Sequence, residues 1–575
     1  MLTIFSTPKP FKGHSNIIQT MTEETGLSFE TPHRSTRSRV LNVILPMAVV
    51  IVLFLVGCML YTHDCLDDPY ITYRYARNLA RGYGLVWNPG EKPVEGYTTF
   101  LWAAIHAPFI AAGISPLLVS KIISAFSGII LIIFVLSPFN LVIQTGIWRI
   151  ALAIMVAICP ALLFYCQSGM ETFFFMTLIL LGTFLWISSR LSENRLRYVV
   201  GASIILGIAA LTRPEGLLVF GTTWLIDLCQ TRRRGLLSGR WWHGLVQYSL
   251  PFLVIWAPYF LWRFHYYGYF FPNTYYAKYS GNRLRNLPLG FLYIGKAFTS
   301  YLVMPLAFMI GMASSTSVNA DGRLREISSI RKIIFPLSIL ASVYIFYVLW
   351  MGGDDTSAFP SVRLIVPVLP IIWLALFTFC EATVKGTSRL RQALLATALL
   401  ALSLFAWTSD GFMLLKDANP GLRSVNTVRA NLELIYGKAR HLGDESPGEL
   451  ALWVHKVTDS KALIAVPFAG RIPYYADRPA IDTLGLNDVH IAHMAPLQGG
   501  FDVKMDPEYV LSRHPILIVV NVKRCYWYQQ CSFTEAGGWK LGDEHFLELL
   551  RNRSDYSLVD RVPGSICVFE YHPQP

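Results

Sequence analysis

The sequence predicts a polytopic α-helical membrane protein that ends in a soluble α/β domain. Of its 575 residues, 53% are hydrophobic and only 15% are charged, whereas a soluble protein carries about 25% charged residues. Apolar runs of about 18 to 24 residues recur along the chain, and each is long enough to cross a hydrocarbon core of roughly 30 Å. A purely soluble enzyme, a disordered chain, a disulfide-dense scaffold and a collagen-like fibre are therefore excluded.

Residues 1–39 are polar and end in a cluster of arginines, which is typical of a cytoplasmic tail. The following run, 40–61, is too long for a signal peptide and has no small-residue cleavage site after it, so we expect an uncleaved first span. Ten further runs bring the expected total to about eleven spans, all within a transmembrane module of residues 40–410. They lie near 117–136, 147–166, 170–188, 198–212, 215–228, 246–263, 288–311, 333–351, 362–380 and 392–408.

Two parts of this module differ from ordinary spans. The runs 198–212 and 215–228 are short and are separated at Arg213-Pro214, so we expect two half-length helices that meet at a polar turn. The apolar stretch 99–113 is also short, and we expect it to lie along the membrane surface within the first outer loop, residues 62–116.

The distribution of Arg and Lys predicts the orientation. With a cytoplasmic N-terminus, about eighteen basic residues fall in cytoplasmic segments and about ten in outer ones. An odd number of spans then places residues 425–575 outside the bacterial cytoplasmic (inner) membrane. The net charge of +12 follows from this bias, so we expect membrane lipids and no nucleic acid as partners.

Residues 425–575 no longer resemble membrane spans. Short buried strands are expected at 462–467, 516–520 and 566–571, separated by helices and loops. Cys525 and Cys531 could pair if the compartment is oxidising.

The first outer loop carries two adjacent carboxylates, Asp67 and Asp68, at the exit of the first span. Such a pair can supply a general base, or ligands for a hard divalent cation such as Mg²⁺ or Mn²⁺. Asp68 is followed by Pro69, which is also typical of a helix N-cap, and that alternative leaves Asp67 unexplained.

Arg74, Arg77 and Arg81 lie on one face of the helix expected after these acids. Outer arginines oppose the positive-inside bias. A lipid-linked phosphate would account for them, because a guanidinium group binds phosphate through two hydrogen bonds. The alternative is a solvated helix face that pairs with Glu91 and Glu95.

Other outer turns are also charged. Glu171 lies in one turn, and Arg213 and Glu215 lie in another. Because a charge at the centre of a membrane helix costs roughly 2.5–3.5 kcal/mol, such residues pair with one another or mark a polar cavity. Arg213 with Glu171 or Glu215 could therefore be an ion pair that holds helices together.

Two later outer segments combine polar and aromatic residues. Asn273, Tyr275 and Lys278 suit sugar stacking and phosphate neutralisation, although an interfacial aromatic belt would also place tyrosine there. Asp354 belongs to a second acidic pair, which is followed by Arg363. These side chains indicate a site at the lipid–water boundary for group transfer from a lipid phosphate.

Two rival classes are weighed against a transferase. A multi-span secondary transporter of an anionic or lipid-linked substrate would also have many spans and intramembrane charges, but here the polar motifs lie at one face instead of the midplane. A structural subunit would not need paired aspartates and outward arginines. No Walker A, dinucleotide-binding, nucleophile-elbow or His-Glu-x-x-His motif is present.

Six motifs occur in a fixed order between about residues 60 and 495. They are DDPYITYRYARNLARGYGLVWNPGEKPVEGYTTFLW, SGMET, LTRPEG, FPNTYYAK, GGDD followed by an Arg, and AGRIPYYADRPAIDTLGLNDVHIAH. In this order the sequence resembles the bacterial GT-C glycosyltransferases akin to the terminal β-(1→2) arabinofuranosyltransferase of actinobacterial cell walls. It departs from the family pattern between GGDD and Arg363, where we would expect an aromatic or basic residue closer to the acids.

The resemblance implies a GT-C fold and transfer of a sugar, with arabinofuranose favoured, from a polyprenyl-phosphate donor. The acceptor would be an envelope glycan, a lipid or a pilin. An aspartate of the first outer loop would be the base, Asp67 before Asp68 because of the capping alternative, and direct displacement would invert the anomeric centre.

The resemblance also implies where the donor is bound. It places Arg213, Lys278 and Arg363 near the donor phosphate, and Asn273 and Tyr275 at the sugar or phosphate. From their position on the same face we add Arg74, Arg77, Glu215 and Asp354, and Asp67, Asp68 and Asp354 are the candidate ligands for a divalent cation. The C-terminal domain could bind the acceptor glycan, cover the site, or act as a rigid brace.

Overall fold

A computed structural model of the chain describes most of it. The described residues are 36–60, 66–137, 142–192, 195–232, 239–278, 286–302, 306, 320–353, 362–385, 387–408, 446–495, 497–498, 503–520, 540–559 and 567–573. Asp354, Cys525 and Cys531 lie outside them. The chain divides into two units, residues 1–48 and 49–575, and the contacts that build the site all lie within the second unit.

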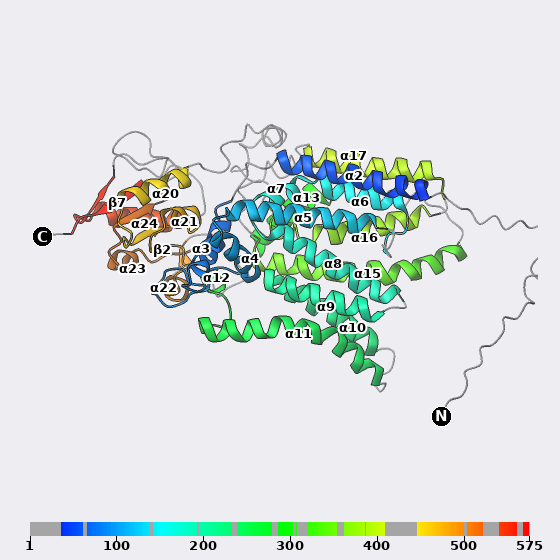
Figure 1. Cartoon of the computed structure of the whole chain (residues 1–575), viewed down its shortest axis with the longest axis horizontal. Helices are drawn as coiled ribbons and strands as arrows, with labels where there is room; N and C mark the ends of the chain where they lie inside the picture. The colour runs from blue at the N-terminus through cyan, green and yellow to red at the C-terminus, as the bar shows by residue number, and fades with distance from the viewer. Residues whose placement is uncertain are drawn as a thin grey trace, which may run out of the picture. The chain divides into compact units, whose positions relative to one another are not determined.

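The chain up to residue 408 is helical wherever the structure describes it in regular elements (Figure 1). The helices are α2 (Thr36–Leu60), α3 (Pro69–Ala80), α4 (Phe100–Ala111), α5 (Pro116–Leu136), α6 (Gly146–Ile158), α7 (Pro160–Gln167), α8 (Thr172–Leu191), α9 (Arg195–Thr212), α10 (Glu215–Arg232), α11 (Gly239–Tyr267), α12 (Asn273–Lys278), α13 (Leu287–Tyr301), α15 (Ala320–Met351), α16 (Leu369–Thr383) and α17 (Arg389–Thr408).

Within the described residues, five helices are long and apolar enough to cross a membrane. They contain the segments Pro116–Leu136, Thr172–Leu191, Arg195–Thr212, Gly244–Tyr267 and Lys332–Met351. Helices α6 and α7 make a sixth if they form one span with a bend of 54°. The chain is therefore a polytopic helical membrane protein, while the predicted number of about eleven spans is not confirmed.

Four predicted helical runs have different boundaries. Helices α9 and α10 are each 18 residues long, so the expectation of two half-length helices is wrong. Helix α9 begins three residues before the predicted run and α10 ends four residues after it. The two helices meet at Arg213-Pro214, where the polar turn was expected. The run 147–166 is broken at Cys159, because Pro160 begins α7 and cannot donate a backbone hydrogen bond to the preceding turn. Helix α16 begins at Leu369 instead of residue 362.

The C-terminal domain contains a mixed five-stranded sheet with the order β2-β1-β5-β7-β6. Strand β1 is parallel to β2 and β5, and β7 is antiparallel to β5 and β6. Its strands and helices are α20 (Ser446–Val457), β1 (Ile464–Val466), α21 (Arg471–Ala476), β2 (Ala480–Asp482), α22 (Val489–Met494), β3 (Leu497–Gln498), β4 (Val503–Lys504), α23 (Pro507–Ser512), β5 (Leu517–Val520), α24 (Lys540–Arg551), β6 (Tyr556–Leu558) and β7 (Cys567–Tyr571). The three predicted strands are β1, β5 and β7.

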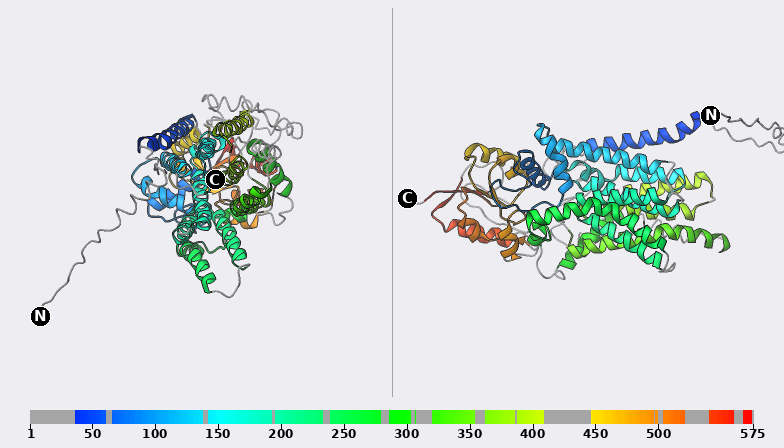
Figure 2. Two further views of the ribbon diagram at one scale, coloured as in Figure 1. Left: turned by 90° about the vertical axis from the view of Figure 1, so that its right-hand side faces the viewer. Right: turned by 60° about the horizontal axis from the view of Figure 1, so that its bottom comes forward.

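The sheet packs a separate hydrophobic core on each face. Ile464 and Val466 of β1 enter one core and Ala465 enters the other, as the alternation of side chains along a strand requires. The core of Ile464 also contains Tyr75 and Ala76 of α3, so the C-terminal domain and the loop 62–116 share one interior. Figures 1 and 2 show α3 and α4 next to the sheet domain at one end of the long helices.

Candidate active site

Asp68 is an accessible carboxylate that is bound by an arginine far away in the sequence. It stands at the N-cap position of α3, but its side chain makes no capping hydrogen bond, so the capping explanation of this carboxylate is wrong. Instead, Arg363 Nη1 donates to Asp68 Oδ2 at 2.6 Å. The Asp68 side chain is 54% exposed and that of Arg363 is 15% exposed. A positioned and accessible carboxylate is what general-base catalysis requires.

Two charged turns of the helical bundle meet beside Arg363. Arg213 binds Glu171 at 2.6 Å and Glu215 through two hydrogen bonds of 2.8 and 3.2 Å. Met170, the residue before Glu171, places its Sδ 3.6 Å from Arg363 Nη1. The prediction that Arg213 forms an ion pair is therefore confirmed, with both glutamates as partners.

The buried cluster of Glu171, Arg213 and Glu215 has a net negative charge when all three side chains are ionised. The Tyr347 hydroxyl adds a hydrogen bond to Glu215 at 3.4 Å. Three of the five N–H groups of Arg213 are bound to these two carboxylates, so only the remaining donors could contact a phosphate while the cluster stays intact. Arg363 joins this cluster to Asp68, so segments from the start of α3, the α7–α8 turn, the α9–α10 turn and the region before α16 converge at one place.

The carboxylate of Asp67 is bound by the C-terminal domain. The backbone N–H of Gly470 donates to Oδ2 at 2.9 Å, and that of Arg471, at the start of α21, donates to Oδ1 at 2.7 Å. A Cβ at position 470 would lie 2.0 Å from the Asp67 carbonyl oxygen, so this close approach requires glycine. Burial raises the pKa of Asp67 to about 6, although the two N–H bonds act in the opposite direction.

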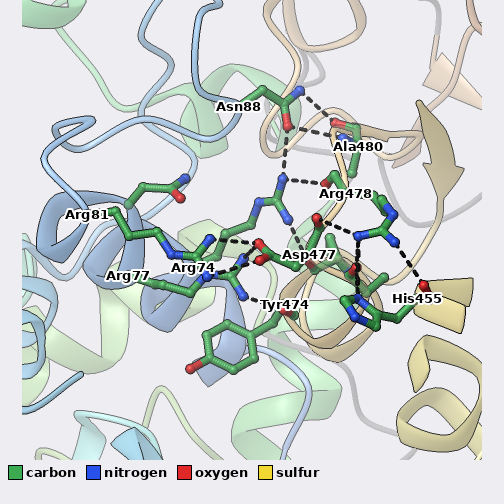
Figure 3. A network of polar contacts seen from close by, with 12 residues as sticks. Arg74, Arg77, Arg81, Asn88, His455, Tyr474, Asp477, Arg478 and Ala480 are labelled. Atoms are coloured by element: carbon green, nitrogen blue, oxygen red, sulfur yellow. Dashed lines mark hydrogen bonds and ion pairs between the residues drawn. The ribbon is translucent and has the colours of Figure 1, made fainter. Parts of the chain in front are cut away.

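Arg74 is also used to dock the C-terminal domain (Figure 3). Its Nε donates to the Trp87 carbonyl at 3.0 Å, and Nη2 donates to Asn88 Oδ1 at 3.0 Å and to the Arg478 carbonyl at 2.8 Å. Its Nη1 donates to the carbonyl of Pro473. The buried guanidinium thus has four acceptors of this chain around it, and two of them belong to the C-terminal domain.

Arg77 and Arg81 converge on Asp477, the residue that follows α21 (Figure 3). Arg77 Nη2 lies 2.8 Å from Asp477 Oδ1, and Arg81 Nη2 lies 3.0 Å from Oδ2. Burial opposes ionisation of Asp477, but the hydrogen bond from Arg81 and the charge of Arg77 lower its pKa below the ordinary value. Arg74 and Arg77 are therefore buried against the C-terminal domain, while the Arg81 side chain stays 47% exposed. The partners of this face are Asp477 and backbone carbonyls instead of Glu91 and Glu95.

Those two glutamates have other partners. Glu95 forms a buried double contact with Arg263 of α11, at 2.6 and 2.9 Å. Glu91 binds Arg513 at 3.2 Å. The first contact attaches the loop 62–116 to the helical bundle, and the second attaches it to the C-terminal domain.

Asn273, the first residue of α12, is a further anchor of the C-terminal domain. Its side-chain Nδ2 donates to the carbonyl oxygens of Gly485, Leu486 and Asp488 at 2.9, 3.1 and 3.1 Å. The neighbouring Tyr275 packs against Phe271 with ring centroids 4.4 Å apart. Lys278, at the end of α12, is exposed.

The structure thus separates the residues selected from the sequence. Asp68, Arg213, Glu215 and Arg363 come together, whereas Asp67, Arg74, Arg77 and Asn273 contact the C-terminal domain. The sequence reasoning missed Asp477 and the Gly470–Arg471 amides as their partners, although the motif AGRIPYYADR contains all three residues. Among the described residues, no group of three or more His, Cys, Asp or Glu side chains is placed to hold a metal ion.

Comparison with solved structures gives the fold class. ArnT from Cupriavidus metallidurans bound to undecaprenyl phosphate is similar with a TM-score of 0.52 and 14% identity, over 92% of this chain and 99% of that chain. Its apo state gives 0.50 and 14% over the same shares. The fold is the GT-C fold.

Other comparisons are weaker. The Archaeoglobus fulgidus oligosaccharyltransferase in the apo form has 12% identity and a TM-score of 0.41, over 83% of this chain and 70% of that chain. A family model described as a domain of unknown function (DUF8728) matches residues 434–565, which is the region after the GT-C bundle. No curated protein matches the sequence.

Proposed function

We propose that this chain is a membrane glycosyltransferase that moves a sugar from a polyprenyl-phosphate donor to an acceptor outside the bacterial cytoplasmic membrane. The observation that carries the proposal is the Asp68–Arg363 pair at one end of a GT-C bundle. ArnT, which has this fold, was crystallised with undecaprenyl phosphate, a lipid phosphate of the proposed class. The clustering of charges at one end gives no support to a transporter.

In the proposed reaction, Asp68 accepts the proton of the acceptor hydroxyl. The acceptor oxygen then forms a bond to C1 of the sugar, and the bond from C1 to the phosphate oxygen breaks with its electron pair going to the polyprenyl phosphate. A single displacement of this kind inverts the anomeric centre. We choose Asp68 over Asp67 as the base, because both carboxylate oxygens of Asp67 accept backbone N–H groups at the start of α21. This choice reverses the preference for Asp67 that was expected from the sequence.

Arg363 is the cation that we place nearest the leaving phosphate, since it lies between Asp68 and the Glu171–Arg213–Glu215 cluster. The cluster orients this side of the site, and Tyr275 and Lys278 of α12 are proposed to contact the donor. Arg74, Arg77 and Asn273 are proposed to act through docking of the domain. Asp354 is kept as a candidate donor or cation ligand.

The test is an assay of the purified chain in nanodiscs with radiolabelled polyprenyl-phosphate sugars and a crude envelope glycan. Arabinofuranose is the first donor, because the motifs resemble that family, and a parallel reaction with EDTA tests for Mg²⁺ or Mn²⁺. Transfer by wild type and by the exposed-acid control Asp459→Asn, but not by Asp68→Asn, supports the proposal. Movement of an intact lipid-linked substrate without any transfer would contradict it.

A second experiment tests the orientation. An alkaline phosphatase fused after residue 575 is expected to be active only if the C-terminal domain is exported. A cytoplasmic reporter active at the same position would contradict the proposed location of the site.

A further inference from the structure

We propose that a tyrosine platform formed by α3 and α21 is the acceptor subsite and that it binds a carbohydrate. The platform consists of Tyr70, Tyr474 and Tyr475, with Arg471 at its edge. This inference rests on the proposed glycosyltransferase function, because it names the chemical class of the acceptor at the same site.

The platform is built from two segments that are about 400 residues apart in sequence. The ring centroids of Tyr70 and Tyr475 are 5.2 Å apart, those of Tyr70 and Tyr474 are 5.3 Å apart, and those of Tyr474 and Tyr475 are 5.2 Å apart. The Tyr475 hydroxyl donates to the Tyr70 hydroxyl at 2.9 Å. The guanidinium carbon of Arg471 lies 5.8 Å from the centroid of the Tyr70 ring.

Exposure distinguishes one ring from the others. Tyr70 is 4% exposed, whereas Tyr475 is 41% exposed. The hydroxyl of Tyr475 is hydrogen-bonded to the buried Tyr70. The Tyr475 ring is therefore held in place before any ligand binds, and it loses little conformational freedom on binding. A large ring that is both fixed and open to solvent is typical of a binding surface.

The chemistry of the platform fits a sugar. One face of a sugar ring presents C–H groups, which pack on an aromatic face, while its edge presents hydroxyl groups. Tyrosine hydroxyls and a guanidinium group at the rim supply the convergent polar groups that orient such a ligand. An acyl chain would need an apolar groove instead, and the platform has polar atoms at its edge.

The position of the platform also fits an acceptor. Tyr70 follows Asp68 by two residues at the start of α3, and its N–H donates to the Asp67 carbonyl at 3.0 Å. The same Asp67 carboxylate binds the backbone of Arg471. The platform is therefore fixed to the same first turn of α3 that follows the proposed base, where an acceptor hydroxyl must be presented.

Docking of the domain is required to assemble this subsite. Arg77 lies over the Tyr474 ring at 4.7 Å and donates to the Tyr474 carbonyl at 2.5 Å. The arginine face of α3 thus holds the α21 half of the platform against the α3 half. On this basis the C-terminal domain is part of the acceptor site and not only a brace.

The test varies Tyr475 in the full chain in nanodiscs. Tyr475→Ala is expected to raise the half-saturating concentration of the crude envelope glycan about tenfold, which corresponds to roughly 1.4 kcal/mol, with the donor KM unchanged. Tyr475→Phe keeps the ring and is expected to lose less. Tyr83→Ala is the matched control, since Tyr83 is another exposed tyrosine, 56% exposed, near the far end of α3.

Binding of the same glycan without donor, followed by tryptophan fluorescence, separates this proposal from the function on which it rests. Glycan binding that depends on Tyr475, without any sugar transfer, would support the glycan subsite and contradict the proposed transferase activity. Transfer with the same glycan dependence in wild type and Tyr475→Ala would overturn the subsite alone. Absence of both binding and transfer in wild type would overturn both.

Discussion

Arg363 Nη1 binds Asp68 Oδ2 at 2.6 Å although the two residues are 295 positions apart. This contact joins the start of α3 to the segment before α16, and through Arg363 to the buried cluster around Arg213. This carboxylate is exposed and held in place by a guanidinium group, and on these two observations we propose it as the base. The neighbouring Asp67 has the opposite surroundings, with both oxygens bound by backbone N–H groups.

The first prediction distinguishes these two acids. Asp68→Asn is expected to lower kcat about 10²- to 10⁴-fold, the range for loss of a general base. The thermal unfolding temperature should fall only slightly, because the amide oxygen can still accept the hydrogen bond from Arg363. Asp67→Asn should retain turnover, because the amide oxygen can still accept one of the two N–H bonds. Initial rates of sugar transfer at saturating donor measure both effects. Loss of turnover in Asp67→Asn with full activity in Asp68→Asn would assign the base to Asp67.

The second prediction concerns Asp477. Asp477→Asn is expected to destabilise docking of the C-terminal domain by about 1.5–3 kcal/mol, the usual range for hydrogen bonds to charged groups. The variant removes the charge and one of the two acceptor oxygens that Arg77 and Arg81 share. Limited proteolysis of the full chain at low protease concentration measures the loosened domain. Asp555→Asn is the matched control, since Asp555 pairs with Arg553 within the domain. Equal proteolysis of both variants would contradict the docking role.

Local patterns in the sequence predict much of the fold. Apolar runs mark the helices of the bundle, and the buried strands β1, β5 and β7 appear as short apolar segments. Strand β1 is as short as β2 and β6, with three residues each, but it lies within the apolar run 462–467. Strands β2 and β6 contain Asp482 and Ser557, so no apolar run marks them. The start of α9 at Arg195 and the end of α10 at Arg232 were missed, because these helices continue into polar residues beyond the apolar runs.

The site could be predicted only in part, because spacing gives the face of a helix but not what packs on it. The i, i+3 and i+7 spacing of Arg74, Arg77 and Arg81 correctly defines one face of α3. Its partners, however, are Asp477 and backbone carbonyls about 400 residues later, and carbonyl acceptors have no sequence signal. Asp68 and Arg363 were both identified, while their contact depends on tertiary structure.

The third prediction concerns Asn273, whose Nδ2 donates to three carbonyls of the C-terminal domain. Asn273→Ala leaves these acceptors without the side-chain donor and is expected to loosen the domain. Asn273→Asp should loosen it more, because a carboxylate would repel the three carbonyl oxygens. Proteolysis measures the docking, and binding of undecaprenyl phosphate measures the donor site. Weaker lipid binding with unchanged proteolysis would instead support the direct sugar or phosphate contact expected from the sequence.

The fourth prediction is a pH dependence at the contact of Asp67 with α21. Burial raises the pKa of Asp67 from 3.8 in the unfolded chain to about 6 in the folded one. The folded state therefore holds this proton more tightly, and its contribution to stability is largest below about pH 4 and is lost as the pH rises through about 6. Asp67→Asn removes the titrating group, and Asp482, whose pKa is also raised to about 6 by burial, is present in both proteins and cancels in their difference.

The measurement is the unfolding temperature of wild type minus that of Asp67→Asn, taken in nanodiscs at several pH values. This difference is expected to fall as the pH rises from about 4 to about 6 and then to stay constant. A difference that rises over the same interval would show that the N–H bonds from Gly470 and Arg471 outweigh burial and favour the carboxylate. In that case the contact would strengthen with ionisation, and a neutral pH would hold the C-terminal domain, together with the tyrosine platform, more firmly than an acidic one.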